Sequence, residues 1–222
     1  MHEGRVVTLE EVTSTQDAAV EHDLQVGDVC ISFNQTAGRG RRVNEWNSKG
    51  GVAVTVVLEE LTPQFSIAIA ATLAAQVNTI VPTHTVRIKW PNDLYVEGKK
   101  LAGVLIEQRD HRFLVGIGIN VEEIPLPNAT SLAELGSGHT KESVASLLAA
   151  SVFEATNLDE MTACAAWRTR DMLIGTVQRV QSGDNIVEGL VLDIDPCHNL
   201  LLEIPDGILT LPAATTTIIT PC

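Results

Sequence analysis

A short stretch rich in glycine and arginine, TAGRGRRVNEW, occupies residues 36–46. Its glycines allow the backbone to approach a bound molecule closely. Its arginines, Arg39, Arg41 and Arg42, carry permanent charge and a planar set of donors suited to phosphate or carboxylate. Because the whole chain has a formal net charge of -13, a local concentration of positive charge favours a loop that holds an anionic small molecule. An exposed basic turn without a ligand is the alternative.

A second basic stretch, RIKWPNDLYVEGKKL, occupies residues 87–101 and contains Lys89, Lys99 and Lys100. Two such stretches are typical of a positive cleft in an acidic protein. Asp93 lies within the second stretch, and a carboxylate in a phosphate-binding cleft is a candidate magnesium ligand. A polar turn residue after the proline is the alternative for Asp93.

Predicted strands lead the chain into both basic stretches. The apolar segment VCISF at 29–33 precedes the first, and a strand at 86–90 that ends at a proline precedes the second. Further strands are expected at 5–9, 51–58, 93–96, 100–108 and 112–121, with tight turns at 97–98 and 109–111. Helices are expected at 16–22, 66–80, 140–155 and 159–171. The predicted fold is α+β, a mixed, largely antiparallel sheet with packed helices.

The pattern of predicted elements changes after residue 172. Short β segments at 175–177, 187–194, 200–204 and 208–211 alternate with turns at 182–184, 195–196 and 205–207. This spacing predicts a small β-barrel. We therefore expect a larger domain at 1–172 and a smaller one at 173–222.

Composition excludes several classes of protein. The N-terminal residues lack the apolar region of a signal peptide, and no run of 18 apolar residues exists to span a membrane. The four cysteines form no C-x-x-C pair, which favours reduced thiols in a cytoplasmic protein. The histidines lack zinc-site spacing, and the acidity argues against general binding of nucleic acid.

Five motifs, taken together in this order, resemble the class II synthetase-like catalytic domain of biotin protein ligases. They are STQ at 14–16, QTAGRGRR at 35–42, KWPNDL at 89–94, KLAGVLIE at 100–107 and GIGINV at 116–121. The resemblance covers nearly the whole chain, and residues 173–222 resemble the small SH3-like C-terminal domain of that family. It implies a ligase that joins biotin to ATP, forming biotinoyl-adenylate and pyrophosphate. The biotinoyl group then passes to a lysine of a biotin carboxyl carrier domain, in acetyl-CoA carboxylase or a related carboxylase.

The resemblance also implies roles for individual residues. Biotin is expected to contact Ser14, Thr15, Gln16, Gln35, Arg39, Gly40, Arg41 and Lys100. ATP is expected to contact Arg42, Trp46, Lys89, Asn92, Asp93 and Asn120, with Asp93 binding Mg²⁺. Lys100 and Arg41 are the expected catalytic cations, because the biotin carboxylate and the α-phosphate are both anions and repel each other. The hydroxyls and the amide at the biotin site suit the ureido ring, which needs both donors and acceptors.

The sequence departs from the family pattern at Val43 and Asn44, where the family usually has glycine and arginine. Valine is stiffer than glycine, and asparagine removes a charge, so loop closure and retention of the adenylate are affected. The STQ motif begins at residue 14, which leaves no room for the N-terminal DNA-binding domain of some members. We expect a monomer or homodimer that binds neither DNA nor a membrane.

Two other functions stay open at this point. The chain could be a protein that binds biotin or biotinoyl-adenylate and transfers it poorly. It could also be a lipoate or octanoate ligase of the same superfamily, although the R-R-x-x-G-G-G-x-V stretch typical of that branch is missing.

Overall fold

The structure is a computed structural model that describes residues 4–40, 45–46 and 50–219. Within these residues, seven strands form the main sheet in the order β1-β2-β5-β9-β8-β7-β6. Their bounds in that order are Val6–Leu9, Val29–Ser32, Gly51–Leu58, Arg112–Asn120, Lys99–Arg109, Asp93–Val96 and Arg87–Lys89. Among the described strands of this sheet, β1 and β2 pair in parallel and the other neighbours pair antiparallel. The predicted mixed, largely antiparallel sheet is confirmed.

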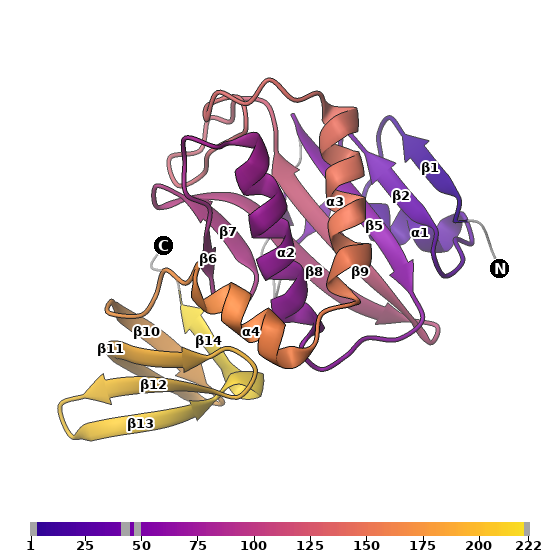
Figure 1. The fold of residues 1–222 in the computed structure, drawn as a ribbon. Coiled ribbons are helices and arrows are strands. Elements are labelled where there is room, and N and C mark those ends of the chain that lie inside the picture. The colour runs from indigo at the N-terminus through magenta and orange to yellow at the C-terminus, as the bar shows by residue number, and fades with distance from the viewer. Residues whose placement is uncertain (1–3, 41–44, 47–49, 220–222) are drawn as a thin grey trace.

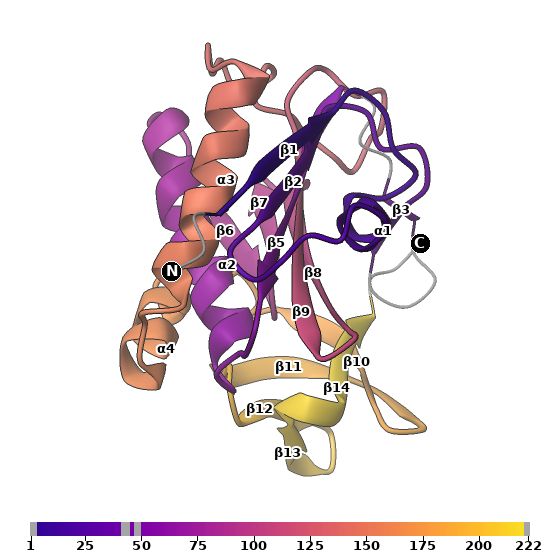
Figure 2. The same cartoon turned by 90° about the vertical axis from the view of Figure 1, so that its right-hand side faces the viewer.

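Helices cover both faces of this sheet. On one face lie α2 (Phe65–Ile80) and α3 (Lys141–Ala155), with α4 (Glu160–Arg168) packed against α2. The short helix α1 (Thr15–Glu21) lies on the opposite face, as Figure 2 shows. Because the central strand β5 is covered on both sides, all eight of its residues are buried, which explains its continuous apolar sequence.

Polar residues begin the helices where the sequence predicts. Ser14, Thr140 and Asp159 are the N-cap residues of α1, α3 and α4, and each side chain accepts a hydrogen bond from a backbone N–H of the first turn. The predicted helix at 159–171 ends earlier, at Arg168. The chain turns there because Asp171 forms a bridge beside Ile88 at the edge strand β6.

An irregularity in the pairing of β7 with β8 decides which β8 side chains share a face. Tyr95 pairs with Lys100, and the preceding Leu94 pairs with Ala102, so β8 carries one extra residue between them. Such a bulge shifts the alternation of side chains by one residue. Lys100 and Gly103 therefore lie on the same face, although their spacing would separate them on a regular strand.

A second sheet follows the main one in the chain, with the strand order β13-β12-β11-β10-β14 among the described residues. Its strands in chain order are β10 (Val177–Ser182), β11 (Asn185–Asp195), β12 (Asn199–Ile204), β13 (Gly207–Pro212) and β14 (Thr216–Ile219), and the 3-10 helix η1 (Ala213–Thr215) precedes β14. The segment predicted at 175–177 overlaps β10 only at Val177, and β14 was not predicted. Figure 1 shows this sheet beside α4.

One hydrophobic core joins the two sheets. It contains side chains from α2 and the main sheet together with Val191, Ile194 and Ile218 of the second sheet. Trp90 and Trp167 are also buried in this core. In the described part of the chain, no helix is long and apolar enough to cross a membrane.

Candidate functional site

A cavity of about 350 Å³ lies on the face of the main sheet that carries α1. A row of successive pairing partners crosses the strands β6, β7, β8, β9 and β5 there, and it consists of Lys89, Asp93, Gly103, Gly118 and Ala53. All five residues line the cavity. Side chains of directly paired residues share a face of the sheet, so the row places a cation and a carboxylate at one end of a floor made of small residues.

Glycines in this floor are required by close approach. A Cβ at Gly118 would lie 2.3 Å from Nε1 of Trp46, and a Cβ at Gly103 would lie 2.9 Å from Oδ1 of Asp93. Trp46 therefore lies directly over the backbone of β9. Its Nε1 is buried and has no hydrogen-bond partner among the described residues, so it is a donor available to a bound molecule.

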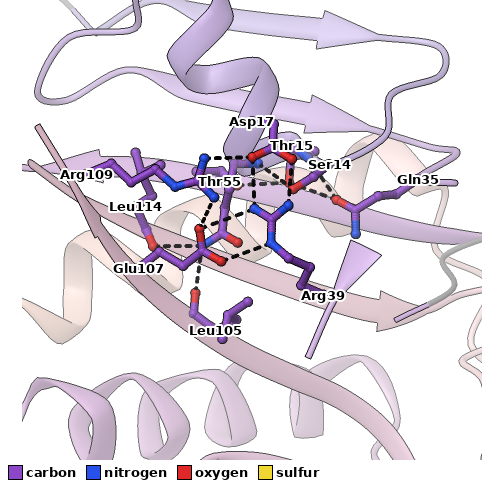
Figure 3. Close-up of polar contacts among 11 residues, drawn as sticks. Ser14, Thr15, Asp17, Gln35, Arg39, Thr55, Leu105, Glu107, Arg109 and Leu114 are labelled. Carbon is purple, nitrogen blue, oxygen red and sulfur yellow. Dashed lines mark hydrogen bonds and ion pairs between the residues drawn. The ribbon is translucent and has the colours of Figure 1, made fainter. Parts of the chain in front are cut away.

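The opposite end of the cavity carries uncharged donors and acceptors, which Figure 3 shows beside the ion pairs of Arg39. Oε1 of Gln35 accepts hydrogen bonds from the backbone N–H of Thr15 at 2.9 Å and from its hydroxyl at 3.3 Å. The Thr15 hydroxyl in turn accepts from Thr55 at 2.9 Å. Ser14, which also lines the cavity, caps α1. The predicted side chains at this end are therefore held in fixed orientations by one another.

Gln16 holds α1 against the sheet. Its Nε2 donates to the backbone carbonyls of Leu105 at 3.2 Å and Leu114 at 3.1 Å. Gly116 leaves space for this side chain, because a Cβ there would lie 3.1 Å from Cδ of Gln16. Gln16 also lines the cavity. Its hydrogen bonds position α1 whether or not its side chain contacts a ligand.

Arg39, the first arginine of the predicted loop, is bound by two carboxylates (Figure 3). Its guanidinium donates to Asp17 at 2.6 and 3.0 Å and to Glu107 at 3.0 and 3.2 Å. Arg109 also pairs with both carboxylates, at 2.8 Å to Asp17 and 2.6 Å to Glu107. The hydrogen bond from Arg39 holds the pKa of Asp17 below its usual range. The network ties the strand β3 (Gly38–Arg39) to α1 and β8.

Lys100 and Lys89 form the cationic end of the cavity. Nζ of Lys100 lies 2.8 Å from Oδ2 of Asp93 and 5.6 Å from the centre of the Trp46 ring. Nζ of Lys89 lies 5.8 Å from the centre of the Tyr95 ring. Burial lowers the pKa of Lys89, and the charge of Lys100 lowers it further, while Asp93 opposes the shift. The two lysines therefore share one carboxylate in a partly buried site.

The structure brings most of the predicted site residues to this cavity. Those that line it are Ser14, Thr15, Gln16, Gln35, Arg39, Gly40, Trp46, Lys89, Asp93 and Lys100. Asn92 and Asn120 do not line it. Asn92 donates to Ser66 at 3.2 Å, and Asn120 donates to the carbonyl of Thr130 at 3.0 Å, where it holds the loop after β9. Arg41, Arg42, Val43 and Asn44 lie outside the described residues.

Several residues of the site were not predicted. Asp17, Glu107 and Arg109 were missed because their partner Arg39 is far away in sequence, 68 residues from Glu107. Thr217, Ile218 and Ile219 of β14 also line the cavity. Nothing in their sequence indicates this, because the contact depends on how the second sheet packs against the first.

The residues at the cationic end suit a divalent cation only together with a ligand's own oxygens. In the described part of the chain, no group of three or more His, Cys, Asp and Glu side chains could hold a metal. Asp93 supplies one carboxylate at the cavity. Mg²⁺ bound to a nucleotide usually takes one or two carboxylates plus phosphate oxygens and water, and this donor set fits that arrangement.

The fold matches that of several solved structures. A biotin protein ligase from Aquifex aeolicus, solved in complex with biotin and ATP, matches with a TM-score of 0.85 at 24% identity, over 98% of this chain and 99% of that chain. A biotin protein ligase from Leishmania major, in complex with biotinyl-5-AMP, matches with a TM-score of 0.69 at 22% identity, over 94% and 99% of the two chains. At these identities the likeness establishes a shared fold.

Sequence comparison identifies the family. The model of the biotin/lipoate A/B protein ligase family matches residues 8–122. The bifunctional ligase/repressor BirA of Escherichia coli (strain K12) is 30% identical, over 93% of this chain and 71% of that protein. The biotin–[acetyl-CoA-carboxylase] ligase of Mycobacterium tuberculosis is 34% identical, over 80% and 74%. The chain belongs to the biotin/lipoate A/B protein ligase family, and the resemblance drawn from the five motifs is confirmed.

Proposed function

We propose that this protein is a biotin protein ligase. It joins biotin to ATP, giving biotinoyl-5'-AMP and pyrophosphate, and then transfers the biotinoyl group to one lysine of a biotin carboxyl carrier domain. Its relatives include enzymes named for ligation of biotin to acetyl-CoA carboxylase. ATP, Mg²⁺ and biotin are accordingly its small-molecule requirements.

The observation that carries this proposal is the polarity of the cavity. One end presents the hydroxyl of Thr15 and the amide of Gln35, held by hydrogen bonds to each other and to the buried Thr55, and these groups match a neutral ureido ring. The other end presents Lys89 and Lys100, which match a carboxylate and a phosphate. Between them, the glycine floor and the Trp46 ring that lies over Gly118 are the walls against which an apolar chain would lie. A biotin molecule laid along this floor has its reacting carboxylate beside the lysines.

Lys100 is the residue to which we assign the main catalytic charge. When the carboxylate attacks the α-phosphate, negative charge accumulates on the phosphate oxygens. A fixed ammonium in a partly buried cavity stabilises that charge without a large reorganisation of solvent. The bulge in β8 gives Lys100 its direction, and Asp93 holds its Nζ in place at 2.8 Å. Bound Mg²⁺ would supply further charge neutralisation of the phosphates beside Asp93.

The side chain of Arg39 is better suited to anchoring than to ligand binding. Its charge is balanced by Asp17 and Glu107, so little positive field from it reaches the cavity. By fixing the start of the glycine-rich loop, it places the backbone of Gly40 at the cavity wall. We assign the direct contact with the activated intermediate to Arg41, and contacts with the nucleotide to Arg42 and Trp46.

The second sheet supports a two-unit organisation with a boundary at 172/173. Five short antiparallel strands with tight turns are the features expected of an SH3-like domain. We propose that this unit forms the end wall of the cavity through β14 and helps to receive the carrier domain. A cytoplasmic protein that binds no DNA, as a monomer or homodimer, is consistent with this function.

An isotope-exchange experiment tests the proposal. The protein is incubated with Mg-ATP and labelled pyrophosphate, with biotin, lipoate or octanoate in parallel, and a carrier domain is added afterwards. Biotin-dependent incorporation of the label into ATP, followed by biotinylation of one carrier lysine, is the expected result. Biotin binding without exchange would identify a binding protein, and exchange with lipoate or octanoate alone would identify the other branch of the family. Either result would overturn the proposed activity.

A further inference from the structure

Two cysteines from different units lie side by side at the junction of the two sheets. Sγ of Cys164, on α4, lies 3.2 Å from Sγ of Cys197, which is in the turn between β11 and β12. The two residues are 33 positions apart in the chain. Both side chains are partly exposed, whereas Cys30 is buried. Cys222 lies outside the described residues.

Ion pairs on both sides of the two cysteines hold α4 against the second sheet. Glu160, Cys164 and Arg168 are spaced four residues apart and therefore share one face of α4. Each meets the same segment of the second sheet: Glu160 lies 3.6 Å from His198, Cys164 meets Cys197, and Arg168 pairs with Asp193. The cysteine pair is the centre of a three-point contact.

A disulfide needs the sulfurs about 2.05 Å apart, so the thiols must approach each other by only about 1.2 Å from their 3.2 Å separation. The exposed ion pairs on both sides leave the site open to a small solute.

We propose that Cys164 and Cys197 are a redox modification site that closes into an inter-unit disulfide when the protein meets a peroxide. Hydrogen peroxide first oxidises one thiol to a sulfenic acid and releases a water molecule. The sulfur of the other cysteine then displaces the hydroxyl from that sulfenic acid, forming the S–S bond and a second water. Overall, two S–H bonds and one O–O bond are broken, and both hydrogens leave in water.

Other roles for the pair are less well supported. A metal site would need further ligands, and none of the described residues complete one. Simple packing does not explain why both thiols stay accessible. Burial raises the pKa of Cys197 to about 12, with additional effects from Cys164, Glu160 and Asp195. This cysteine is therefore mostly protonated at neutral pH, and closure is expected to be slow there and faster in mild alkali.

A disulfide between Cys164 and Cys197 would form close to the ligand cavity. Nε1 of Trp90 donates to the carbonyl of Pro196, the residue before Cys197, at 3.2 Å. Trp90 lines the cavity beside Lys89. A disulfide that ties the turn between β11 and β12 to α4 would therefore also restrain Trp90 in the cavity wall. It would restrain the second sheet, which carries β14, as well.

Peptide mapping of the intact chain tests the site without depending on enzyme activity. The Cys30→Ser/Cys222→Ser variant retains only the proposed pair; it is treated with hydrogen peroxide at about pH 8.5 and then alkylated. The expected product is a linked peptide containing Cys164 and Cys197, lighter by two hydrogens, which dithiothreitol separates. Cys164→Ser and Cys197→Ser are matched controls in which this product cannot form.

Thermal unfolding gives a second readout. Closing a loop of this length raises Tm by roughly 5–10 °C in a chain of this size, and the rise should disappear in dithiothreitol and in both single variants. Two thiols that remain open to alkylation after treatment that fully oxidises glutathione would overturn the proposal. Oxidation of each cysteine separately to sulfinic acid, without a linked peptide, would also overturn it.

Discussion

Replacing Lys100 by alanine should abolish most adenylation while leaving the fold intact. The structure separates the two contributions of this residue. Its backbone N–H donates to Asn128 at 3.0 Å and its carbonyl accepts from Thr130 at 2.9 Å, and neither bond requires the side chain. The side chain contacts Asp93 and the Trp46 ring in the cavity.

The expected losses of stability and of rate follow from the exposure of the Lys100–Asp93 ion pair and from its position in the cavity. The side chains of Lys100 and Asp93 are 31% and 30% exposed, and an ion pair of that kind contributes at most about 1 kcal/mol to the free energy of unfolding. For a chain of this length, the expected decrease in Tm is about 2–4 °C. Loss of a fixed charge opposite the developing charge of the transition state costs about 3–4 kcal/mol, or roughly 100- to 1000-fold in rate.

The assay is biotin-dependent pyrophosphate exchange, with Tm measured on the same preparations. Lys99→Ala is the matched control, since Lys99 is an exposed neighbour on the same strand and does not line the cavity. Lys100→Ala/Asp93→Asn tests whether the loss comes from the unpaired carboxylate rather than from the missing cation. The reasoning would be refuted if Lys100→Ala exchanged within about threefold of the wild type, or if the double variant recovered full activity.

Three further predictions concern the floor, the anchor and the end wall of the cavity. Gly118→Ala should displace Trp46 and weaken biotin binding by at least about tenfold in calorimetry, whereas Gly138→Ala, where a Cβ meets nothing within 4 Å, should have no effect. Asp17→Asn should lower Tm at pH 6. Because the pKa of Asp17 is depressed in the folded state, the stabilisation that its ion pairs provide is complete above about pH 4 and is lost as the pH falls further. The difference in Tm between this variant and the wild type should therefore shrink toward pH 3. Thr217→Asp should raise KM for ATP by roughly tenfold, because the new carboxylate would repel the phosphates. The control is Thr210→Asp on β13, since Thr210 does not line the cavity. Equal KM values in both variants would remove β14 from the site.

Sequence reasoning succeeded where the signal is local. The β-branched run of β5 and the alanine-rich α2 were predicted to within a residue, because their apolar patterns reflect burial directly. Lys89 and Lys100, singled out by the basic motifs, both line the cavity, while their predicted roles toward ATP and biotin remain predictions. The bulge that aligns Lys100 with Gly103 could not be predicted, because it arises from pairing between β7 and β8.

Contacts between distant segments escaped prediction for the same reason. The basic loop indicated a phosphate cradle, yet the first arginine in it is balanced by carboxylates from α1 and β8. Spacing also gave no hint that Cys164 and Cys197 would meet. In both cases the residue types were noticed, and only the packing of remote elements decides what they contact.

The last strand of the described chain links the second sheet to the ligand cavity. β14 pairs with β10 in the second sheet, while Thr217 and Ile219 line the cavity of the first. Ile218, between them, also lines the cavity and belongs to the core that the two sheets share. A single strand thus pairs within the second sheet, contributes to the shared core and helps to line the cavity. The cavity wall can therefore form only when the second sheet is docked, and any change that loosens that junction should act on the ligand site.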